Sequence, residues 1–412
     1  MNTFTRSYYT AMNTQAENLG FDFFKPPKNS VPPTIMQILP SLNSGGVERG
    51  TIEMSEAIVS SGWNSVVVSD GGALVDKLTC NGAKHIKIPA GSKNPFDWYK
   101  SYKQLKTAIS DNNVSLVHAR SRMPAWVSLK AAKENKVPFV TTFHGRYPDT
   151  NFAKKLYNSV MVRGDRVIAI SRYVADEILR RYDIRHEQLR IIPRGADLDA
   201  FNSESILHQQ TEKLIQEWDI DTASPLIILP ARITRWKGQE LLIDALSQIK
   251  DMPFVCLLIG SYSEKQTFKS TLEALIRKKD LNSRVKIVGH CPDMAAAYKM
   301  ADVVVSASLD PEPFGRVAVE AQAMGRILVA ADHGGARETV LSNVTGVLVE
   351  PRDAGSLAKG IKKALTMSLD QQTKMSEAAI QHIKANFSRT AMCYRTISLY
   401  CEILGFSPKG VS

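Results

Sequence analysis

The residues best suited to chemistry lie in the segment EPFGRVAVE, which runs from Glu312 to Glu320. Pro311 and Pro313 hold the chain extended ahead of it, so a helix can begin only near Gly315. Glycine at this position lets a ligand approach the backbone closely, and the first turn of a helix offers unbonded amide groups to an anion. The segment therefore predicts a helix start that binds an anion.

Carboxylates flank this helix start on both sides. Glu312 precedes it, and Glu320 lies about one turn inside the helix. Between them, the amides of Phe314, Gly315 and Arg316 are expected to face outward. Two carboxylates can accept hydrogen bonds from two sets of hydroxyls while the amides hold a negative charge, and a nucleotide sugar presents these groups. The alternative is a surface pair between Arg316 and Glu320, with Glu312 an ordinary loop acid.

A second group of charges follows the apolar run PLIILPA, in the segment ARITRWKGQELLIDAL. Arg232, Arg235 and Lys237 stand at the start of a predicted helix. Cations are unfavourable there because a helix amino terminus carries partial positive charge. A diphosphate among them would remove this conflict.

Glycines and histidines follow predicted strands of the first half. The segment PSLNSGGVERG places Gly45 and Gly46 before a helical pattern, but the spacing is not GxGxxG, and a packing or turn role is open. His144 ends the run PFVTTF beside Gly145, where an imidazole either meets a substrate or is structural. The segment HARSR, residues 118–122, either offers cations to an acidic acceptor or forms a solvated rim.

One further glycine turn follows the run ILVAAD in the second half. It contains Gly334 and Gly335, with Glu338 three residues later. A turn role alone would explain the two glycines.

The segment EPFGRVAVE resembles the Glu, seven residues, Glu pattern of the retaining glycosyltransferases of family 4, which have two Rossmann-like domains in the GT-B arrangement. The resemblance spans roughly residues 35 to 404. It implies that Glu312 contacts hydroxyls of the donor sugar and that Glu320 contacts the ribose of the nucleotide. Arg232 and Lys237 stand where the family has an Arg and a Lys-Gly pair, which implies that they grip the pyrophosphate; Arg235 is expected to face solvent.

The same resemblance extends to the other candidates. It places Gly45 and Gly46 on the donor side, His144 near the reacting sugar, and Gly335 and Glu338 near the donor site. It also implies that the anomeric configuration is retained, by attack from the face of departure through an oxocarbenium-like state. A leaving phosphate oxygen would help to accept the proton of the acceptor, since no residue is a convincing nucleophile.

We expect this activity to need neither a metal nor a cofactor. Arg232, Lys237 and the helix amides can stabilise a leaving diphosphate, which is the task of a divalent metal in other enzymes. The donor is expected to be a UDP- or GDP-linked hexose, which acts as a substrate.

These residues need two parallel sheets to position them. Short β-branched runs that end in Gly, Asp, Ser or His and precede helical patterns are typical of βα units. The first series is TIMQIL, SVVVSD, VSLVHA, PFVTTF, RVIAIS and LRIIP, and the second is PLIILPA, FVCLLIG, VKIVGH, DVVVSAS, ILVAAD and GVLVEP. We predict an α/β protein of GT-B type, in which the sheets of two Rossmann-like domains face a cleft and ligands bind beyond the carboxyl ends of the strands.

The expected domain limits follow from these two series. Residues 1–33 form a loose tail, 34–205 an acceptor-side domain, 206–386 a nucleotide-sugar-binding domain, and 387–412 a closing helix that packs back on the first domain. The connector IPRGADLDAFN contains Asp197 and Asp199, which we attribute to turn chemistry and not to a metal site.

Composition describes an ordinary globular protein of 412 residues, 44% hydrophobic and 23% charged, without a run of about 18 apolar residues that could span a membrane. Five scattered cysteines without CxxC spacing favour a reducing cytoplasm. The net charge of +11 is concentrated in residues 1–205, with 27 Lys and Arg against 19 Asp and Glu. Such a field attracts phosphates, nucleic acid or acidic lipid, or serves only solubility.

The sequence says less about the acceptor. Residues 96–109, FDWYKSYKQLKTAI, predict a helix with apolar residues near one side and Lys100, Lys103 and Lys106 at three-residue spacing. A basic amphipathic helix suits docking on an anionic bilayer, and an ordinary packed helix fits the pattern as well. We expect a lipid-linked or lipopolysaccharide-core acceptor at the inner face of the cytoplasmic membrane, with a soluble acceptor as the alternative.

Two other protein classes share features with this sequence. A nucleotide-dependent oxidoreductase should show GxGxxG with an acidic residue about twenty positions later, and neither half does. A non-catalytic basic module that binds nucleotide or nucleic acid would use charge alone. It leaves the two glutamates of EPFGRVAVE and the cations beside them unexplained, so we expect no nucleic-acid partner.

Overall fold

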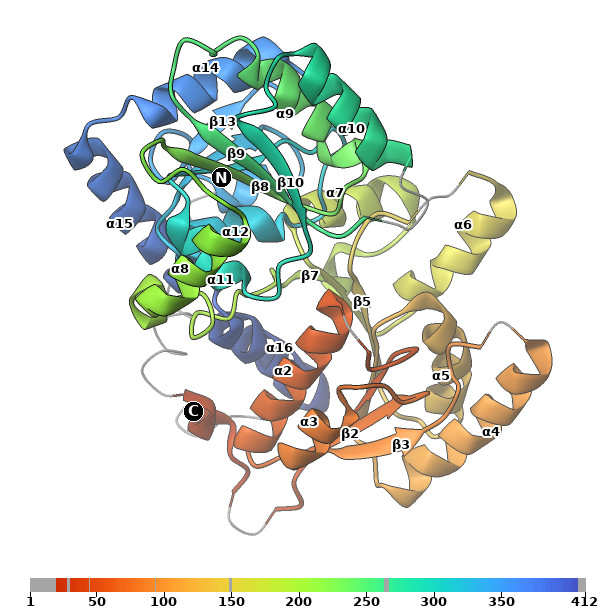
Figure 1. Cartoon of the computed structure of the whole chain (residues 1–412). Helices are drawn as coiled ribbons and strands as arrows, with labels where there is room; N and C mark the ends of the chain where they lie inside the picture. The colour runs from red at the N-terminus through yellow and green to blue at the C-terminus, as the bar shows by residue number, and fades with distance from the viewer. Residues whose placement is uncertain are drawn as a thin grey trace. The chain divides into compact units, whose positions relative to one another are not determined.

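The computed structural model describes residues 20–27, 30–43, 45–92, 94–147, 150–262 and 267–406. The chain forms two compact units. Unit 1 contains the described residues up to Gly195 and those from Arg389 onward, and unit 2 contains Ala196–Ser388. Each unit is an α/β structure with its own parallel sheet, as the strand pattern predicts (Figure 1).

The sheet of unit 1 has the strand order β3-β2-β1-β4-β5-β6-β7, and all neighbours pair in parallel. Its strands are β1 (Thr34–Ile38), β2 (Asn64–Ser69), β3 (Lys84–Lys87), β4 (Leu116–Ala119), β5 (Phe139–Phe143), β6 (Arg166–Ala169) and β7 (Leu189–Ile191). Its α-helices are α2 (Gly46–Ser60), α3 (Val75–Cys80), α4 (Pro95–Asp111), α5 (Arg122–Glu134), α6 (Phe152–Asn158), α7 (Arg172–Arg181) and α16 (Arg389–Leu404). Three 3-10 helices complete it: η1 (Gly20–Phe24), η2 (Ser159–Val162) and η3 (His186–Gln188).

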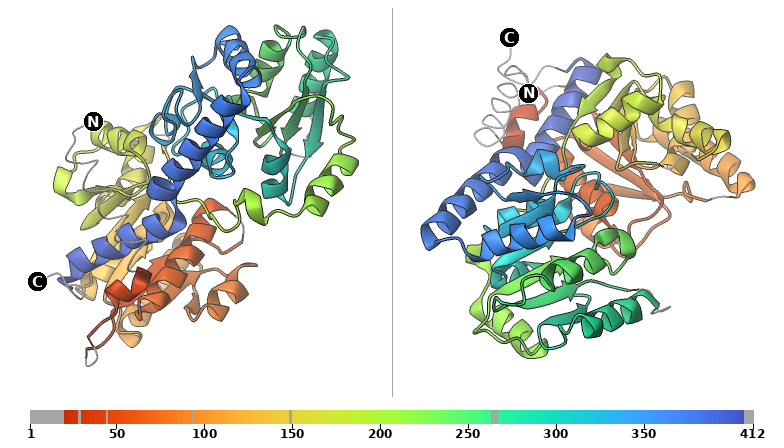
Figure 2. Two further views of the ribbon diagram at one scale, coloured as in Figure 1. Left: turned by 90° about the vertical axis from the view of Figure 1, so that its left-hand side faces the viewer. Right: turned by 90° about the horizontal axis from the view of Figure 1, so that it is seen from above.

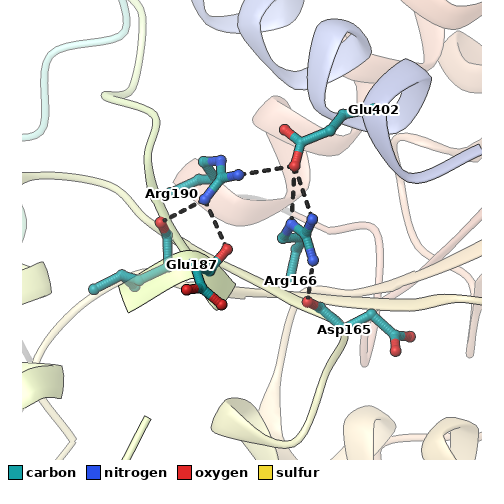
Figure 3. Close-up of polar contacts among 6 residues, drawn as sticks. Asp165, Arg166, Glu187, Arg190 and Glu402 are labelled. Atoms are coloured by element: carbon teal, nitrogen blue, oxygen red, sulfur yellow. Dashed lines mark hydrogen bonds and ion pairs between the residues drawn. The ribbon is translucent and has the colours of Figure 1, made fainter. Parts of the chain in front are cut away.

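The C-terminal helix α16 belongs to unit 1, where it packs against α2 (Figure 2). Its Ile397 and Tyr400 are fully buried in the hydrophobic cluster that α2 and the sheet share. An ion cluster fixes the far end of the helix, because Glu402 Oε1 accepts hydrogen bonds from Arg166 Nη2 and Arg190 Nη2, each at 2.8 Å (Figure 3). Apolar packing and charge therefore attach α16 to the sheet.

The sheet of unit 2 has the order β10-β9-β8-β11-β12-β13, again with all neighbours parallel. Its strands are β8 (Leu226–Pro230), β9 (Val255–Ile259), β10 (Val285–Gly289), β11 (Val303–Ser306), β12 (Ile327–Ala331) and β13 (Val347–Val349). Its helices are α8 (His208–Glu217), α9 (Gln239–Leu246), α10 (Thr267–Lys278), α11 (Met294–Met300), α12 (Arg316–Ala323), α13 (Ala336–Thr339), α14 (Ala354–Leu365) and α15 (Leu369–Phe387), with the 3-10 helices η4 (Ser203–Ser205) and η5 (Arg235–Lys237). Two buried clusters, one on each face, separate this sheet from its helices.

The boundary between the units lies earlier than the expected residue 205. The amide of Ala196 donates to the carbonyl of Phe387 at 2.7 Å, and Phe201 packs its ring 5.9 Å from that of Tyr298, edge to face. The connector therefore crosses the boundary after Gly195, and its residues from Ala196 onward belong to unit 2. The chain leaves unit 2 again after Ser388. This hydrogen bond, between residues far apart in sequence, is invisible to local composition.

The expected loose tail of residues 1–33 is wrong for its described part. Residues 20–24 form η1, and Phe24 is fully buried with its ring 4.7 Å from that of Tyr394. The indole nitrogen of Trp63 donates to the carbonyl of Phe24 at 2.9 Å. Residues 1–19 lie outside the described residues.

Strand β3 is the one described strand of unit 1 that the apolar pattern does not predict. Its sequence, KHIK, has a lysine at each end, both exposed, because it is an edge strand that pairs only with β2. None of the described helices is long and apolar enough to cross a membrane.

Candidate functional site

In unit 2 the strand order reverses between β8 and β11, which are neighbours in the sheet but far apart in sequence. Chain that leaves the carboxyl ends of two such strands diverges to opposite faces of the sheet and opens a crevice in which ligands bind. The loop after β8 carries Arg232 and Lys237, and the loop after β11 carries Glu312. The predicted site residues therefore lie at the switch point of the sheet.

The structure brings Lys237 and Glu312 together. Lys237 Nζ lies 2.7 Å from Glu312 Oε1, and only 13% and 16% of the two side chains are exposed. The hydroxyl of Ser308 donates to the same Oε1 atom, and Lys237 Nζ also lies 4.2 Å from the ring centroid of Trp236. This pair holds a lysine ammonium and a carboxylate in fixed positions at the switch point.

Gly238 allows this approach between the two loops. It has a φ of 78°, and a Cβ at this position would lie 1.9 Å from the carbonyl oxygen of Ala307. Any side chain would thus push the loop after β8 away from the loop after β11.

The helix start predicted in EPFGRVAVE is present one residue later than Gly315. Helix α12 begins at Arg316, and Gly315 precedes it in the left-handed conformation with a φ of 82°. Among the described residues, no hydrogen bond uses the amide of Phe314 or of Gly315. These two amides at a helix amino terminus are the donors that a phosphate would need.

The backbone of the glycine turn after β12 packs against the segment that precedes this helix start. A Cβ on Gly334 would lie 2.5 Å from the carbonyl oxygen of Glu312, and one on Gly335 would lie 2.3 Å from that of Phe314. The amide of Gly335 also donates to the carbonyl of Glu312 at 2.8 Å. The glycine pair is therefore explained by backbone packing, which fixes the segment from Glu312 to Phe314.

Glu320 is buried, with 9% of the residue exposed. Arg316 Nη2 lies 2.6 Å from Glu320 Oε1, and the Tyr298 hydroxyl donates to Oε2 at 3.0 Å. Burial, together with the charge of Glu320 and the hydrogen bond to it, raises the pKa of Tyr298 well above its usual value, so the phenol keeps its proton. The pair between Arg316 and Glu320 does form, but it is not a pair of two surface residues, since the carboxylate lies inside unit 2.

The remaining candidates of unit 2 are Arg232, Arg235 and Glu338. Arg232 is exposed; its carbonyl accepts from Gln239 at 2.9 Å, and its guanidinium makes no hydrogen bond or ion pair with a residue that the structure describes. Arg235 is exposed as well, with its guanidinium 5.6 Å from the ring centroid of Phe268. Glu338 is half-buried in α13.

In unit 1 the strand order reverses between β1 and β4. Gly45 and Gly46 follow β1: Gly45 precedes α2 with a φ of 144°, and Gly46 is the first residue of the helix. Arg120 follows β4, and His144 follows β5, the next strand in the sheet. Gly45 and Gly46 therefore follow one strand of the switch point, whereas His144 follows the strand next to it.

The ring of His144 is held through one nitrogen. Arg194 Nη2 lies 2.8 Å from His144 Nδ1, while the buried Nε2 has no hydrogen-bond partner among the described residues. Burial lowers the pKa of His144 well below its ordinary value, and the nearby Arg194 and Arg120 lower it further. His144 is therefore neutral at physiological pH.

The segment HARSR is neither a solvated rim nor a free cation source. His118 is buried, with Nδ1 2.6 Å from the Tyr400 hydroxyl and Nε2 2.7 Å from the Thr142 hydroxyl. Arg120 is 7% exposed, and its Nε donates to Gln37 at 2.7 Å. The expectation is wrong because α16, far away in sequence, covers this strand.

Asp197 acts in a turn, as expected. Its Oδ1 accepts from the amide of Asp199 at 3.2 Å and from that of Ala200 at 3.4 Å.

Sequence reasoning missed several residues of both sites. Ser308 and Tyr298 bind the two glutamates, and Arg194 binds His144. Ser308 follows a predicted strand and could have been found by its position at the strand end. Tyr298 and Arg194 carry no local signal, because their partners are 22 and 50 residues away.

Two family models match the chain. The model described as Glycosyltransferase Family 4 matches residues 44–200, and the model described as Glycosyl transferases group 1 matches residues 210–382. The first lies within unit 1 apart from its last five residues, and the second lies within unit 2.

Similar proteins have been solved or characterised. The crystal structure of a glycosyltransferase from Rickettsia africae is 37% identical, covers 93% of this chain and 100% of its own, and superposes with a TM-score of 0.85. The structure of HepE from Anabaena in complex with UDP is 22% identical, covers 90% of this chain and 100% of its own, and has a TM-score of 0.77. The D-inositol 3-phosphate glycosyltransferase of Xylanimonas cellulosilytica is 27% identical over 341 residues, which are 76% of this chain and 81% of that protein.

The chain has two Rossmann-type units, each with candidate residues next to its switch point. Together with the likeness to the Rickettsia structure, this gives it the GT-B fold of glycosyltransferases. The chain belongs to the group 1 glycosyltransferases, as the two family models and the Rickettsia structure show.

Proposed function

We propose that this glycosyltransferase moves a hexose from a UDP- or GDP-linked donor to an acceptor hydroxyl, with retention of the anomeric configuration. The observation that carries this proposal is the pair of Lys237 and Glu312 beside the unbonded amides of Phe314 and Gly315. The ammonium and the amides suit a diphosphate, and the carboxylate suits sugar hydroxyls. The complex of HepE with UDP supports a uridine donor.

Binding of the donor would exchange the partners of Lys237. In the free protein its ammonium contacts Glu312, whereas a diphosphate offers it a second anion. As Lys237 turns toward the phosphates, Glu312 becomes available to accept from the sugar. The exposed Arg232 would also contact the diphosphate. Glu320 would contact the ribose after Arg316 moves away from it.

The bond from the anomeric carbon to the β-phosphate oxygen breaks, and the acceptor oxygen attacks on the same face. The acceptor proton passes to the leaving phosphate oxygen. Lys237, Arg232 and the amides of α12 would stabilise the negative charge on the diphosphate, so we propose that the reaction needs no metal ion. His144 and the glycines of unit 1, Gly45 and Gly46, would lie on the sugar side.

We propose a lipid-linked acceptor, such as a lipopolysaccharide-core glycan, reached at the inner face of the cytoplasmic membrane. Helix α4 carries Phe96 and Tyr99 with exposures of 86% and 60%, beside the exposed Lys100 and Lys103. Its other apolar side, with Leu105 and Ile109 buried, packs into unit 1.

Helix α6 also has exposed apolar side chains next to exposed lysines. Phe152 and Leu156 are 82% and 48% exposed, next to Lys154 and Lys155. Helix α5 contacts α4 and the turn η2, which in turn contacts α6, and Figure 1 shows α4 and α6 on the same side of unit 1. Each phenylalanine that inserts into the bilayer would contribute about 1.5–3 kcal/mol to the free energy of membrane binding. Each lysine near an anionic membrane surface would add about 1 kcal/mol.

A soluble, phosphorylated polyol is the second candidate acceptor. It is favoured by curated relatives named D-inositol 3-phosphate glycosyltransferases, of which the Xylanimonas protein is one. The basic charge of the first half suits either acceptor.

The donor site is tested by thermal shift with UDP, GDP and ADP in the presence of EDTA. Stabilisation by one of them, lost in Lys237→Ala and Glu320→Ala, supports the site. Lys278→Ala, at the end of α10, is the matched control. Equal stabilisation of all variants, or none in the parent protein, would refute the proposed site.

The acceptor is tested with vesicles and with transfer assays. We expect co-sedimentation with vesicles that contain phosphatidylglycerol but not with pure phosphatidylcholine, and loss of binding in Phe96→Ser with Phe152→Ser. Leu369→Ser, at a 79% exposed leucine of α15 in unit 2, should bind like the parent. Transfer to inositol phosphate, without vesicle binding, would instead favour the soluble acceptor.

A further inference from the structure

The hydrogen bond between Arg194 and His144 fixes the position of the imidazole proton. Arginine remains protonated in proteins and can only donate, so Nδ1 of His144 must be the acceptor of the 2.8 Å contact. A neutral imidazole carries one proton, which therefore lies on Nε2. This assignment follows from the partner and needs no observed hydrogen.

The Nε2–H group has no acceptor among the described residues, although the nitrogen is shielded from solvent. Buried donors in native proteins nearly always have a partner, and an exception calls for an explanation. His144 follows β5 next to the switch point of unit 1, where a ligand would approach. A ligand oxygen, which reaches this nitrogen once the atoms that cover it move aside, is the missing partner that this position suggests.

The surroundings of the ring oppose a second proton. Arg194 and Arg120 are the cations that face it, His118 is a further buried imidazole nearby, and the phenol of Tyr147 contacts the backbone of His144. Burial and these charges lower the pKa of His144 well below its usual range. The ring therefore stays neutral across physiological pH.

We propose that Arg194 is a positioning residue that holds His144 as the neutral Nε2–H tautomer and so presents a hydrogen-bond donor to a hydroxyl of the transferred sugar. This inference rests on the proposed function for the identity of the ligand. The oxocarbenium-like state carries positive charge, and an imidazolium at the same place would repel it. A neutral donor binds the hydroxyl without adding a further positive charge at the point of contact, so that the charge of Arg194 stays on the far side of the ring.

The tautomer is tested directly by nitrogen NMR of the full-length protein labelled with ¹⁵N-histidine, with His144→Gln used to assign the signal. In the parent protein we expect Nε2 to show the shift of a protonated nitrogen and Nδ1 that of an unprotonated one, unchanged from pH 8 to pH 5. In Arg194→Met the ring should mix tautomers or titrate within this range. A protonated Nδ1 in the parent, or an unchanged spectrum in Arg194→Met, would overturn the assignment.

The role in transfer is tested by the pH dependence of kcat/KM. Arg194→Met should lower kcat several-fold and add an acidic limb to the profile, while the KM for the nucleotide sugar changes less. Arg194→Lys, which keeps a donor, should restore part of the rate, and Arg185→Met is the control at an exposed arginine of the same unit. Folding of each variant is checked by its melting temperature.

The outcomes separate the two proposals. If Arg194→Met folds, changes the tautomer and leaves the pH profile as in the parent, the positioning role is refuted. If the parent transfers no sugar, the proposed function fails, while the NMR result still decides the tautomer.

Discussion

Substitution of Lys237 and Glu312 should affect the stability of the protein and its affinity for nucleotide in different ways. At 2.7 Å and an effective dielectric constant of 20, the attraction between the two charges is about 6 kcal/mol. Desolvation of two side chains that are only 13% and 16% exposed offsets most of it. Removal of one partner leaves the other charge largely buried, and a fully buried case costs about 3–5 kcal/mol. We expect about 2 kcal/mol here because some exposure remains.

Lys237→Met and Glu312→Gln should therefore each lower the melting temperature of unit 2 by about 4–8 °C, at about 2–4 °C per kcal/mol for a unit of this size. The double variant has no unpaired charge, and we expect it to lose less than about 1 kcal/mol. The two single losses of about 2 kcal/mol each, set against a loss below about 1 kcal/mol in the double variant, give a coupling free energy of about 3–4 kcal/mol. Differential scanning calorimetry of the four proteins measures it.

Nucleotide binding should not recover in the double variant. Loss of a charged hydrogen bond to a phosphate costs about 1.5–3 kcal/mol, which is about 10- to 150-fold in affinity. Titration calorimetry with UDP and GDP should show this loss in Lys237→Met and equally in the double variant. Affinity that returns with stability would mean that Lys237 serves only Glu312. Additive losses of stability would mean that the pair contributes nothing as a pair.

Four other substitutions test a buried hydrogen bond, an ion cluster and two glycines. Tyr298→Phe leaves one oxygen of the buried Glu320 without its partner, and chemical denaturation should show a loss of about 1–3 kcal/mol. Glu402→Gln weakens the cluster of Figure 3 and should cost about 1 kcal/mol at pH 7, because the carboxylate is 42% exposed. Although burial opposes ionisation, its arginine partners lower the pKa of Glu402, so this contribution is present above the ordinary value of 4.5. It should vanish as pH falls through the lowered value, and denaturation from pH 7 to pH 3 follows the change. Gly335→Ala should cost more than about 2 kcal/mol because its Cβ meets backbone, whereas Gly50→Ala in α2, with no atom closer than 3.9 Å, should be neutral or stabilising by about 0.5–1 kcal/mol.

The sequence predicts the fold well because the signals of a parallel sheet are local. Buried strands such as β8 and β11 are short β-branched runs, and their order along the chain indicates two sheets. The helix start at Gly315 was predictable for the same reason, since two prolines and one glycine determine it. Strand β3 was missed because an edge strand does not need an apolar face.

Contacts between distant segments could not be predicted. The partner of His144 is Arg194, fifty residues away, and the burial of His118 depends on Tyr400 in the last helix. Phe24 lies in a segment whose prolines suggest a loose tail, but it packs on Tyr394 from the other end of the chain. These errors share one cause, since each depends on where a remote segment packs and not on the residues nearby.

The two glutamates of EPFGRVAVE differ in a way that their spacing hides. Glu312 shares one oxygen between Lys237 and Ser308, so its charge is balanced by a cation that a diphosphate can draw away. Glu320 has both oxygens bound within unit 2, one by Arg316 and one by Tyr298. A nucleoside diphosphate without its sugar would draw Lys237 away and leave Glu312 without a cation, whereas the complete donor supplies hydroxyls in its place. On the proposed function, the sugar would therefore strengthen binding of the phosphates through Glu312, and this one carboxylate would couple the recognition of both ends of the donor.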